Sequence, residues 1–185
     1  KHPSVVFCTP EDGLRYGYVT SLGVDLPGIT GFNEAGLTLT AHTRMHVDID
    51  PDGTCIADLG HEIIRRARTL GEAVDIARKL GASSTWGLLV SSASERDAVL
   101  IETTGAAVRV TRPGADHHLA CTNRYRNPEL SRGEVITSTA FAVDSDARFE
   151  TLQRAAAGGG LSAADLRALL ATSEDPNAAP GCTAD

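Results

Sequence analysis

Cysteine is scarce in this 185-residue sequence, and the four cysteines follow no pattern that would organise a fold. No two of them form a Cys-x-x-Cys pair and none lies in a cluster with histidines, which argues against a zinc site or a disulfide framework. We expect free thiols in a reducing compartment, and hence a cytoplasmic protein without a metal or other cofactor. The four are Cys8, Cys55, Cys121 and Cys182.

Two further absences concern membranes and the chain ends. No apolar run approaches the roughly 18 residues of a membrane-spanning helix. No charged-then-apolar leader opens the chain. The first residue is Lys1 where a natural start would have Met, and the last residues form neither a strand nor a helix cap. We therefore expect a processed chain or a fragment, incomplete at both ends, with no membrane partner.

Positive charge is in the minority. The chain has 17 Lys and Arg residues against 24 Asp and Glu residues, a net charge of −7, and its basic residues are scattered. A surface of this kind disfavours nucleic acid and anionic membranes as partners. Arginine strongly outnumbers lysine and alanine is abundant, which is typical of a GC-rich and bacterial genome.

The apolar content, 42% of the residues, is sufficient for one folded domain spanning residues 1–185. Alternating apolar and polar residues between turn signals predict strands, and residues 23–31 predict a Gly/Pro loop. The predicted strands are Ser4–Thr9, Leu14–Ser21, Leu37–Thr43, Trp86–Ser92, Ala98–Thr103, Ala107–Thr111 and Leu119–Thr122.

Helical spacing of apolar residues replaces this alternation in two parts of the chain. Residues 56–80 predict two helices, of which the second begins with a capping box at Thr69 and Glu72 and ends at Gly81. A third helix is predicted to begin near Asp144. That start would put Arg148 in the first turn, where its charge opposes the helix dipole. With a last helix predicted over 162–172, the chain belongs to the α+β class.

Asn123 is the candidate catalytic residue that the local sequence singles out. It follows the apolar residues 119–121 at the end of a predicted buried strand, where an amide side chain can face a cleft. A neutral amide donor that does not titrate suits the stabilisation of an oxyanion. The alternative is an Asn that hydrogen-bonds its own turn, because Asn127 and Pro128 follow closely.

Two patterns invite a metal interpretation. His42 and His46 share a strand face only if the strand continues, and no third ligand stands at a standard spacing. Asp48, Asp50 and Asp52 match the first half of a calcium loop. The twelfth position of that loop is a leucine and a proline interrupts it, so a solvated acidic turn is the better interpretation.

Three other polar features remain open. The strand 37–43 carries hydroxyl groups and His42 on its polar side, which faces either solvent or a cleft. Glu102 ends an apolar strand and is either a buried carboxylate or a charge at the rim. His117 and His118 lack a Ser or Asp partner at a recognisable spacing, which favours a polar loop.

In order and spacing, these segments resemble the N-terminal nucleophile hydrolases of the isopenicillin N acyltransferase and choloylglycine hydrolase type. The resemblance runs from about Pro3 to Thr172, and no single motif in it is specific. Its parts are Gly31-Phe32-Asn33-Glu34-Ala35-Gly36-Leu37, a helical pair, a three-strand meander, Cys121-Thr122-Asn123 and Ser145-x-x-Arg148-Phe149.

The resemblance implies a four-layer αββα sandwich and a mechanism. In the family, an autocatalytically exposed N-terminal cysteine attacks a linear amide or a thioester with its own α-amine as the base. Water or an amine acceptor then resolves the acyl-enzyme. A small-molecule amide or an acyl-CoA-like substrate is implied, while homo-oligomer formation stays open.

The resemblance also assigns residues. The Thr-Asn dipeptide of the family supplies an oxyanion-hole amide, which falls on Asn123. The strand after the Asn-Glu-x-Gly-Leu turn supplies a backbone donor, which falls on Thr43 or the neighbouring His42. The arginine near the nucleophile in the bile-salt branch falls on Arg148.

The chain departs from the family pattern at the nucleophile. The family's cysteine precedes a Gly-x-x-x-x-x-Arg-Asn-x-Asp segment, and this chain has neither, while its first residues resemble the following strand. We therefore expect the nucleophile upstream of Lys1, with Cys8 and Cys182 as weaker alternatives. Two other functions stay open: a catalytically inactive domain that binds a ligand or partner, and a calcium-binding module.

Overall fold

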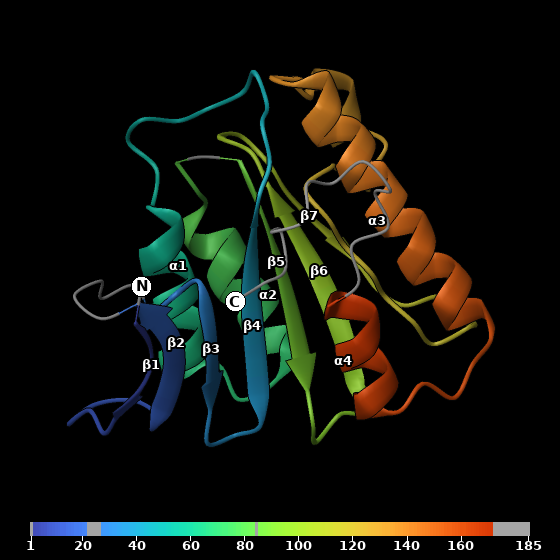
Figure 1. Ribbon diagram of the computed structural model, residues 1–185. Helices are drawn as coiled ribbons and strands as arrows, with labels where there is room; N and C mark the ends of the chain where they lie inside the picture. The colour runs from blue at the N-terminus through green and yellow to red at the C-terminus, as the bar shows by residue number, and fades with distance from the viewer. Residues whose placement is uncertain (1, 22–26, 84, 172–185) are drawn as a thin grey trace. The chain divides into compact units, whose positions relative to one another are not determined.

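Seven strands form one antiparallel sheet in which the order in space equals the order in the sequence. The computed structural model describes residues 2–21, 27–83 and 85–171 (Figure 1). It divides into two units, Lys1–Val135 and Ile136–Asp185, and the sheet lies in the first. The strands are β1 (Pro3–Cys8), β2 (Tyr16–Ser21), β3 (Thr30–Asn33), β4 (Leu37–Thr43), β5 (Trp86–Ser92), β6 (Asp97–Thr103) and β7 (Val108–Thr111).

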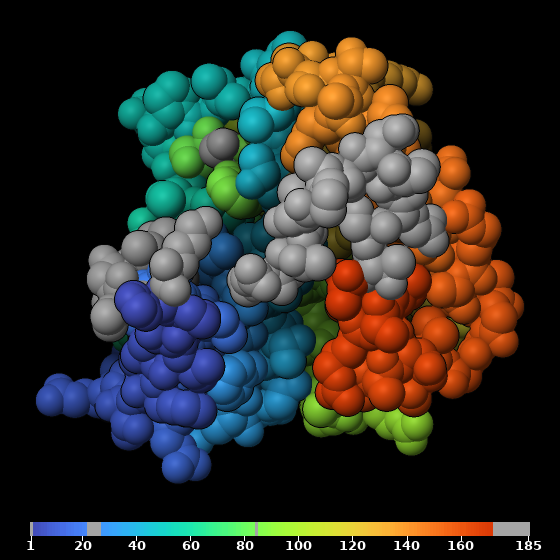
Figure 2. Space-filling model, viewed as in Figure 1, coloured from blue at the N-terminus to red at the C-terminus, as the bar shows by residue number. Residues whose placement is uncertain are grey.

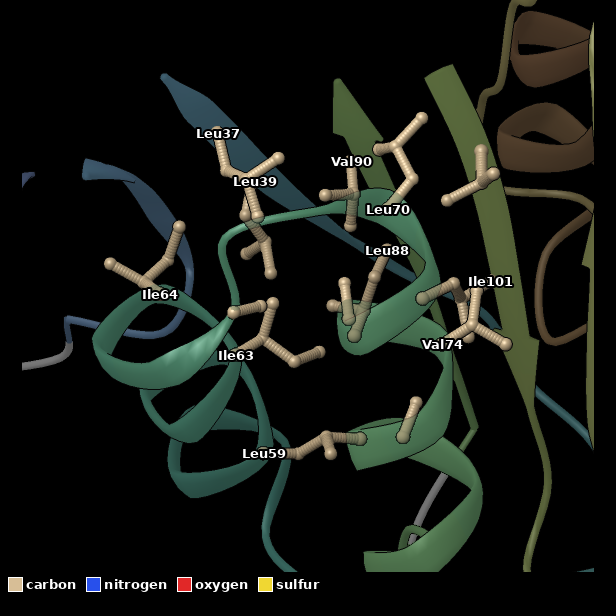
Figure 3. Close-up of a cluster of buried hydrophobic side chains, with 14 of the residues drawn as sticks. Leu37, Leu39, Leu59, Ile63, Ile64, Leu70, Val74, Leu88, Val90 and Ile101 are labelled. Atoms are coloured by element: carbon tan, nitrogen blue, oxygen red, sulfur yellow. The ribbon is translucent and has the colours of Figure 1, made fainter. Parts of the chain in front are cut away.

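Helices α1 (Ile56–Arg66) and α2 (Leu70–Leu80) connect β4 to β5 and cover one face of the sheet (Figure 1). The apolar side of each helix packs on the alternate residues of the strands that point toward it. Side chains such as Leu39, Leu88 and Ile63 are fully buried there (Figure 3). This layer is the main hydrophobic core of the first unit.

The predicted capping box of α2 forms with one difference, because the Glu72 side chain binds the N–H of the residue before the N-cap. The Thr69 hydroxyl accepts the Glu72 backbone N–H at 3.2 Å, and the Glu72 carboxylate accepts the Arg68 backbone N–H at 2.6 Å. Gly81 ends the helix at φ 65°, a conformation that costs glycine little. The sequence therefore determines both ends of this helix locally.

Asn33 joins the turn between β3 and β4 to the end of α1. Its side-chain nitrogen donates to the carbonyls of Ile64 and Ala67, both at 2.8 Å. Its side-chain oxygen accepts the N–H groups of Ala35 and Leu37, both at 3.1 Å. One buried amide therefore satisfies the last carbonyls of a helix and orients the strand that leads to Thr43.

Two strand predictions are wrong. Residues 30 and 31, placed in the Gly/Pro loop, begin β3, because a short strand between turns carries too little alternation to be recognised. Residues 119–122 form no strand, and the meander ends at β7. Cys121 and Thr122 are nevertheless buried, which shows that an apolar run predicts burial without predicting a strand partner.

The face of the sheet opposite α1 and α2 carries exposed apolar side chains at β1–β3. The register places them on one side, because Val5 lies opposite Val19 and the Phe7 ring packs edge-on against Phe32 at 6.0 Å. Figure 2 shows the atoms of these strands in blue on this face. The first unit thus forms one helical layer and one sheet of the expected αββα sandwich, and the β1–β3 part of the second sheet face is exposed.

The second unit contains α3 (Thr139–Ala157) and α4 (Ala163–Ala171). The predicted start of α3 near Asp144 is wrong, because the helix begins earlier, where the Ser138 hydroxyl accepts the Phe141 N–H at 3.4 Å. Arg148 therefore lies in the middle of α3 and not in its first turn. In the part of the chain described, no helix combines the length and apolarity needed to cross a bilayer.

Candidate active site

Asn123 lies against the end of β4. Its side-chain nitrogen donates to the Thr43 carbonyl at 3.1 Å, across a sequence separation of 80 residues. Because the partner is a carbonyl, the contacting atom must be the amide nitrogen, which carries two hydrogens. Both residues are half-buried. The fold thus brings together the two residues that the sequence analysis assigned to an oxyanion hole.

Asn127, and not Asn123, makes the local turn contacts considered as the alternative. Its side-chain oxygen accepts the backbone N–H groups of Glu129 at 3.0 Å and Leu130 at 3.3 Å. These bonds begin the short 3-10 helix Leu130–Gly133. Asn127 therefore accounts for the local turn, and the role of Asn123 as an oxyanion donor stays a prediction.

The hydrogen bonds between β3 and β4 show in which direction the Thr43 N–H points. Ala41 donates its N–H to the Ile29 carbonyl at 2.7 Å, on the β3 side of β4. Alternate residues of a strand present their N–H groups to the same side, so the Thr43 N–H also points there. The pairing of β3 with β4 begins at Thr30 and Thr40, so Thr43 lies beyond the end of the β3 ladder.

Sequence reasoning missed Arg44, the residue directly after Thr43. Its side chain is fully buried, with its Nε 3.5 Å from the Glu102 carboxylate, whose side chain is also fully buried. The guanidinium lies over the Tyr125 ring, 5.6 Å from its centroid. Glu102 is thus a buried carboxylate, the first of the two interpretations left open by the sequence.

Glu102 connects this ion pair to the segment that follows Asn123. Its carboxylate accepts the backbone N–H groups of Arg126 at 2.7 Å and Asn127 at 2.9 Å. Gly87 lies between His42 and Glu102 in the register, and a Cβ at that position would collide with the Arg44 guanidinium. The sequence offered little sign of the Arg44–Glu102 ion pair. Gly87 and Glu102 face each other only in the folded sheet, and no local pattern connects either of them to Arg44.

Two of the described cysteines, Cys121 and Cys8, are poorly suited to be the nucleophile. Burial raises the pKa of the Cys121 thiol, and the nearby Arg44 charge opposes that effect only in part. Cys8 pairs with Tyr16, which pairs with Asn33 at the turn that leads into β4. Cys8 therefore lies at the same end of the sheet as Leu37, the first residue of β4. Thr43 lies at the other end of that strand, about 20 Å away at ~3.4 Å per residue. Cys55 is exposed next to α1, and Cys182 lies outside the described residues.

The candidate metal ligands have protein partners. Both ring nitrogens of His46 are engaged, because Nδ1 accepts the Asp48 N–H at 2.9 Å and Nε2 lies 3.0 Å from the Leu130 carbonyl. The Asp48 carboxylate accepts from Thr104, and Asp50 accepts the Asp52 N–H. Within the described ranges, no cluster of three His, Cys, Asp or Glu side chains could hold a metal ion.

The polar side of β4 faces a hollow of about 500 Å³. Hydroxyl groups of Thr38 and Thr40 line it, and Thr40 contacts the His42 ring at 3.2 Å. Of the His117 and His118 pair, only His117 lines the hollow. His118 pairs with Asp116 at 3.0 Å. The polar side of the strand thus faces a cleft, and His117 belongs to its loop wall.

Arg148 belongs to the second unit and is described only within it. It pairs with Asp144 one turn earlier on α3, at 2.8 Å, and both side chains are about half exposed. An exposed pair at this spacing is typical of a helix surface and contributes little to stability. A role beside the nucleophile stays a prediction for this residue.

Comparison with solved structures identifies the class as the N-terminal nucleophile hydrolase fold. A variant of the conjugated bile acid hydrolase from Clostridium perfringens has a TM-score of 0.61 and 11% identity, over 91% of this chain and 70% of that one. A second variant of that enzyme has a TM-score of 0.51 and 12% identity, over 68% of this chain and 47% of that one. At these identities the likeness concerns the fold alone.

The family follows from the sequence comparison. The chain belongs to the acyl-coenzyme A:6-aminopenicillanic acid acyl-transferase family, whose model matches residues 7–178. The penicillin V acylase from Agrobacterium tumefaciens is 25% identical, with a TM-score of 0.48, over 63% of this chain and 38% of that one. The chain thus spans about half the length or less of two of these three structures. No curated protein matches it in sequence.

Proposed function

We propose that this chain supplies the oxyanion-stabilising part of a cysteine N-terminal nucleophile enzyme that hydrolyses, or transfers the acyl group of, a linear amide or thioester. The observation that carries the proposal is the contact between the Asn123 amide and the Thr43 carbonyl, 3.1 Å long. Membership of the acyl-transferase family supports it.

In the proposed reaction, the cysteine sulfur attacks the substrate carbonyl carbon and the carbonyl electron pair moves to oxygen. The resulting oxyanion accepts hydrogen bonds from the Asn123 amide and the Thr43 backbone N–H. An amide nitrogen has two hydrogens, so Asn123 can bind the Thr43 carbonyl and an oxyanion together. The C–N bond then breaks, and the amine leaves with the proton that the α-amine took from the thiol. Water or an amine attacks the thioester, its C–S bond breaks, and the cysteine thiol is restored.

We propose a nucleophile encoded upstream of Lys1. The burial and raised pKa of Cys121 and the distance of Cys8 from Thr43 support this placement. The family name and the bile acid hydrolases suggest the probes: an N-acyl derivative of 6-aminopenicillanic acid, a conjugated bile acid, and an acyl-CoA offered with 6-aminopenicillanic acid.

The test of Asn123 uses the protein made from its complete gene. Asn123→Ala should lower turnover of the best of these probes by roughly 10²- to 10³-fold, because one preorganised oxyanion donor is lost. Asn127→Ala is the matched control, since the Asn127 side chain only begins a local turn and the backbone N–H that binds Glu102 is kept, and it should retain turnover within a few-fold. Near wild-type turnover by Asn123→Ala would refute the role.

Intact mass and N-terminal sequencing of the same mature protein test the nucleophile. A new N-terminus at a cysteine upstream of Lys1 is the expected result. A mature chain that begins at Cys8 would replace that nucleophile with Cys8. A mature chain without an N-terminal cysteine would leave a binding domain of this fold as the better description.

A further inference from the structure

Arg44 bridges the two segments that carry the proposed oxyanion donors. Its Nη1 donates to the His42 carbonyl at 3.4 Å, and its Nε donates to the Arg124 carbonyl at 3.1 Å. Arg124 directly follows Asn123 in the sequence. One guanidinium is therefore bonded to the end of β4 and to the segment that contains Asn123.

The contact with His42 acts on the Thr43 donor itself. The His42 carbonyl and the Thr43 N–H belong to the same planar peptide group, so a bond to the oxygen restrains the orientation of the N–H. Donation to a carbonyl also polarises the peptide and strengthens its N–H as a donor. The Asn123 amide binds the next carbonyl, that of Thr43, so two contacts fix this strand end.

The surrounding residues restrict the position of the Arg44 guanidinium. Both Arg44 and Glu102 have fully buried side chains, and Gly87 leaves room where a Cβ would collide with the guanidinium. Arg44 Nη2 is buried with no hydrogen-bond partner among the described residues, an arrangement that reduces stability. A buried charge retained at that cost beside a candidate active site suggests a functional role.

We propose that Arg44 is a positioning residue that holds the Thr43 N–H and the Asn123 amide in the geometry required for oxyanion binding. This inference rests on the proposed function, because the two donors matter only if an oxyanion forms there. Arg44 acts through the carbonyls of His42 and Arg124 and does not touch the substrate. Glu102 and Gly87 keep the guanidinium in place.

The first test replaces Arg44 with lysine in the complete protein, which keeps the charge and removes the fork of donors. With the N-acyl 6-aminopenicillanic acid probe, Arg44→Lys should lower kcat roughly 10- to 100-fold, because misplaced donors lose transition-state stabilisation. KM should stay within about threefold, since ground-state binding is not altered. Equal kcat in Arg44→Lys and wild type would overturn the proposal.

Backbone hydrogen exchange in residues 41–45 provides a readout that does not depend on catalysis. In Arg44→Lys, exchange at this strand end should accelerate by roughly tenfold or more, because its restraint is weakened. Leu59→Ala is the control for general destabilisation, since it removes core packing on the other face of the sheet. It should accelerate exchange in residues 16–21 as much as in residues 41–45 and leave kcat near wild type, whereas Arg44→Lys should accelerate exchange selectively at 41–45. Unchanged exchange in a folded Arg44→Lys protein would overturn the proposal.

Gly87→Ala is the second variant if Arg44→Lys does not fold, because its added methyl group displaces the guanidinium while both charges remain. It should reproduce the faster exchange and the lower kcat, and wild-type behaviour would refute the role of Arg44. The two failures are distinguishable. If Arg44→Lys exchanges faster but Asn123→Ala keeps full turnover, the proposed function is refuted. If neither Arg44→Lys nor Gly87→Ala changes the exchange, only the positioning role of Arg44 is refuted.

Discussion

At the residue scale, Asn33 and Asn123 show how the same type of side chain is used in two different environments. Asn33 makes four hydrogen bonds, to two carbonyls and two N–H groups, and is only 6% exposed. Asn123 is half-buried and contacts the Thr43 carbonyl at the edge of the candidate site. Asn33 therefore belongs to the architecture of the fold, whereas Asn123 lies at the edge of the candidate site.

Asn33→Ala should lower the free energy of unfolding by roughly 2–4 kcal/mol, because it leaves buried donors and acceptors without partners. Urea unfolding followed by the fluorescence of Trp86, the only tryptophan, measures the change. Asn127→Ala, which loses only two bonds in a local turn, is the control and should cost about 1 kcal/mol. Equal stabilities of the two variants would contradict the structural role of Asn33.

At the element scale, Asp48 fastens the segment after β4 to the turn between β6 and β7. Its carboxylate accepts the Thr104 hydroxyl at 2.6 Å and the Ala106 N–H at 3.1 Å, and the hydroxyl contributes most to lowering the pKa of Asp48. Its backbone carbonyl accepts the Gly105 N–H at 3.0 Å. The acidic segment that the sequence analysis interpreted as a solvated turn, with a calcium loop as the weaker alternative, thus includes a structural clamp.

The lowered pKa gives a prediction with a definite sign. A carboxyl group whose pKa is lower in the folded than in the unfolded state stabilises the fold above its ordinary value near 4, and this contribution disappears as the pH falls through the folded pKa. Asp48→Asn should therefore be less stable than wild type at pH 7, and the difference should shrink toward pH 2. Urea midpoints across this range measure it.

Asp52→Asn is the matched control for this titration, because the Asp52 side chain is exposed in the same segment. Its stability at pH 7 should stay within about 0.5 kcal/mol of that of wild type, as for other substitutions of exposed side chains. A constant difference between Asp48→Asn and wild type from pH 7 to pH 2 would show that the carboxylate charge of Asp48 contributes nothing to the clamp.

At the scale of the whole molecule, the main core lies within the first unit. Its buried apolar cluster runs from Leu37 to Ile101, between the sheet and the helices α1 and α2. The contacts at Asn123 and Arg44 also lie within residues 1–135. The first unit thus contains both its own core and the described part of the candidate site, while Arg148 belongs to the second unit.

Residues 1–135 made alone should therefore fold cooperatively, because a unit of this size with its own core can reach the stability of a small domain. A single sigmoidal thermal transition by circular dichroism is the expected result. Leu59→Ala in the same fragment should lower its stability by about 2–5 kcal/mol, because it leaves a cavity under α1. A broad melt that is insensitive to Leu59→Ala would contradict an independent core.

Much of the fold could be predicted from the sequence where the signal is local. The alternation in β4, the Thr69 cap of α2 and the glycine that ends this helix each depend on residues within a few positions, and these predictions are confirmed. The start of α3 was predicted wrongly because several residues before Asp144 can cap a helix. Residues 119–122 were assigned to a strand because burial was mistaken for pairing.

The sequence by itself determined the α+β class, most elements and the family resemblance, because repeating local patterns and motif order carry that information. The tertiary structure alone decided which polar residues meet. It brought Asn123 to Thr43 and enclosed Arg44 with Glu102, pairs that are separated by 80 and 58 positions. Such contacts depend on strand register and on the packing of distant segments, so no local pattern encodes them.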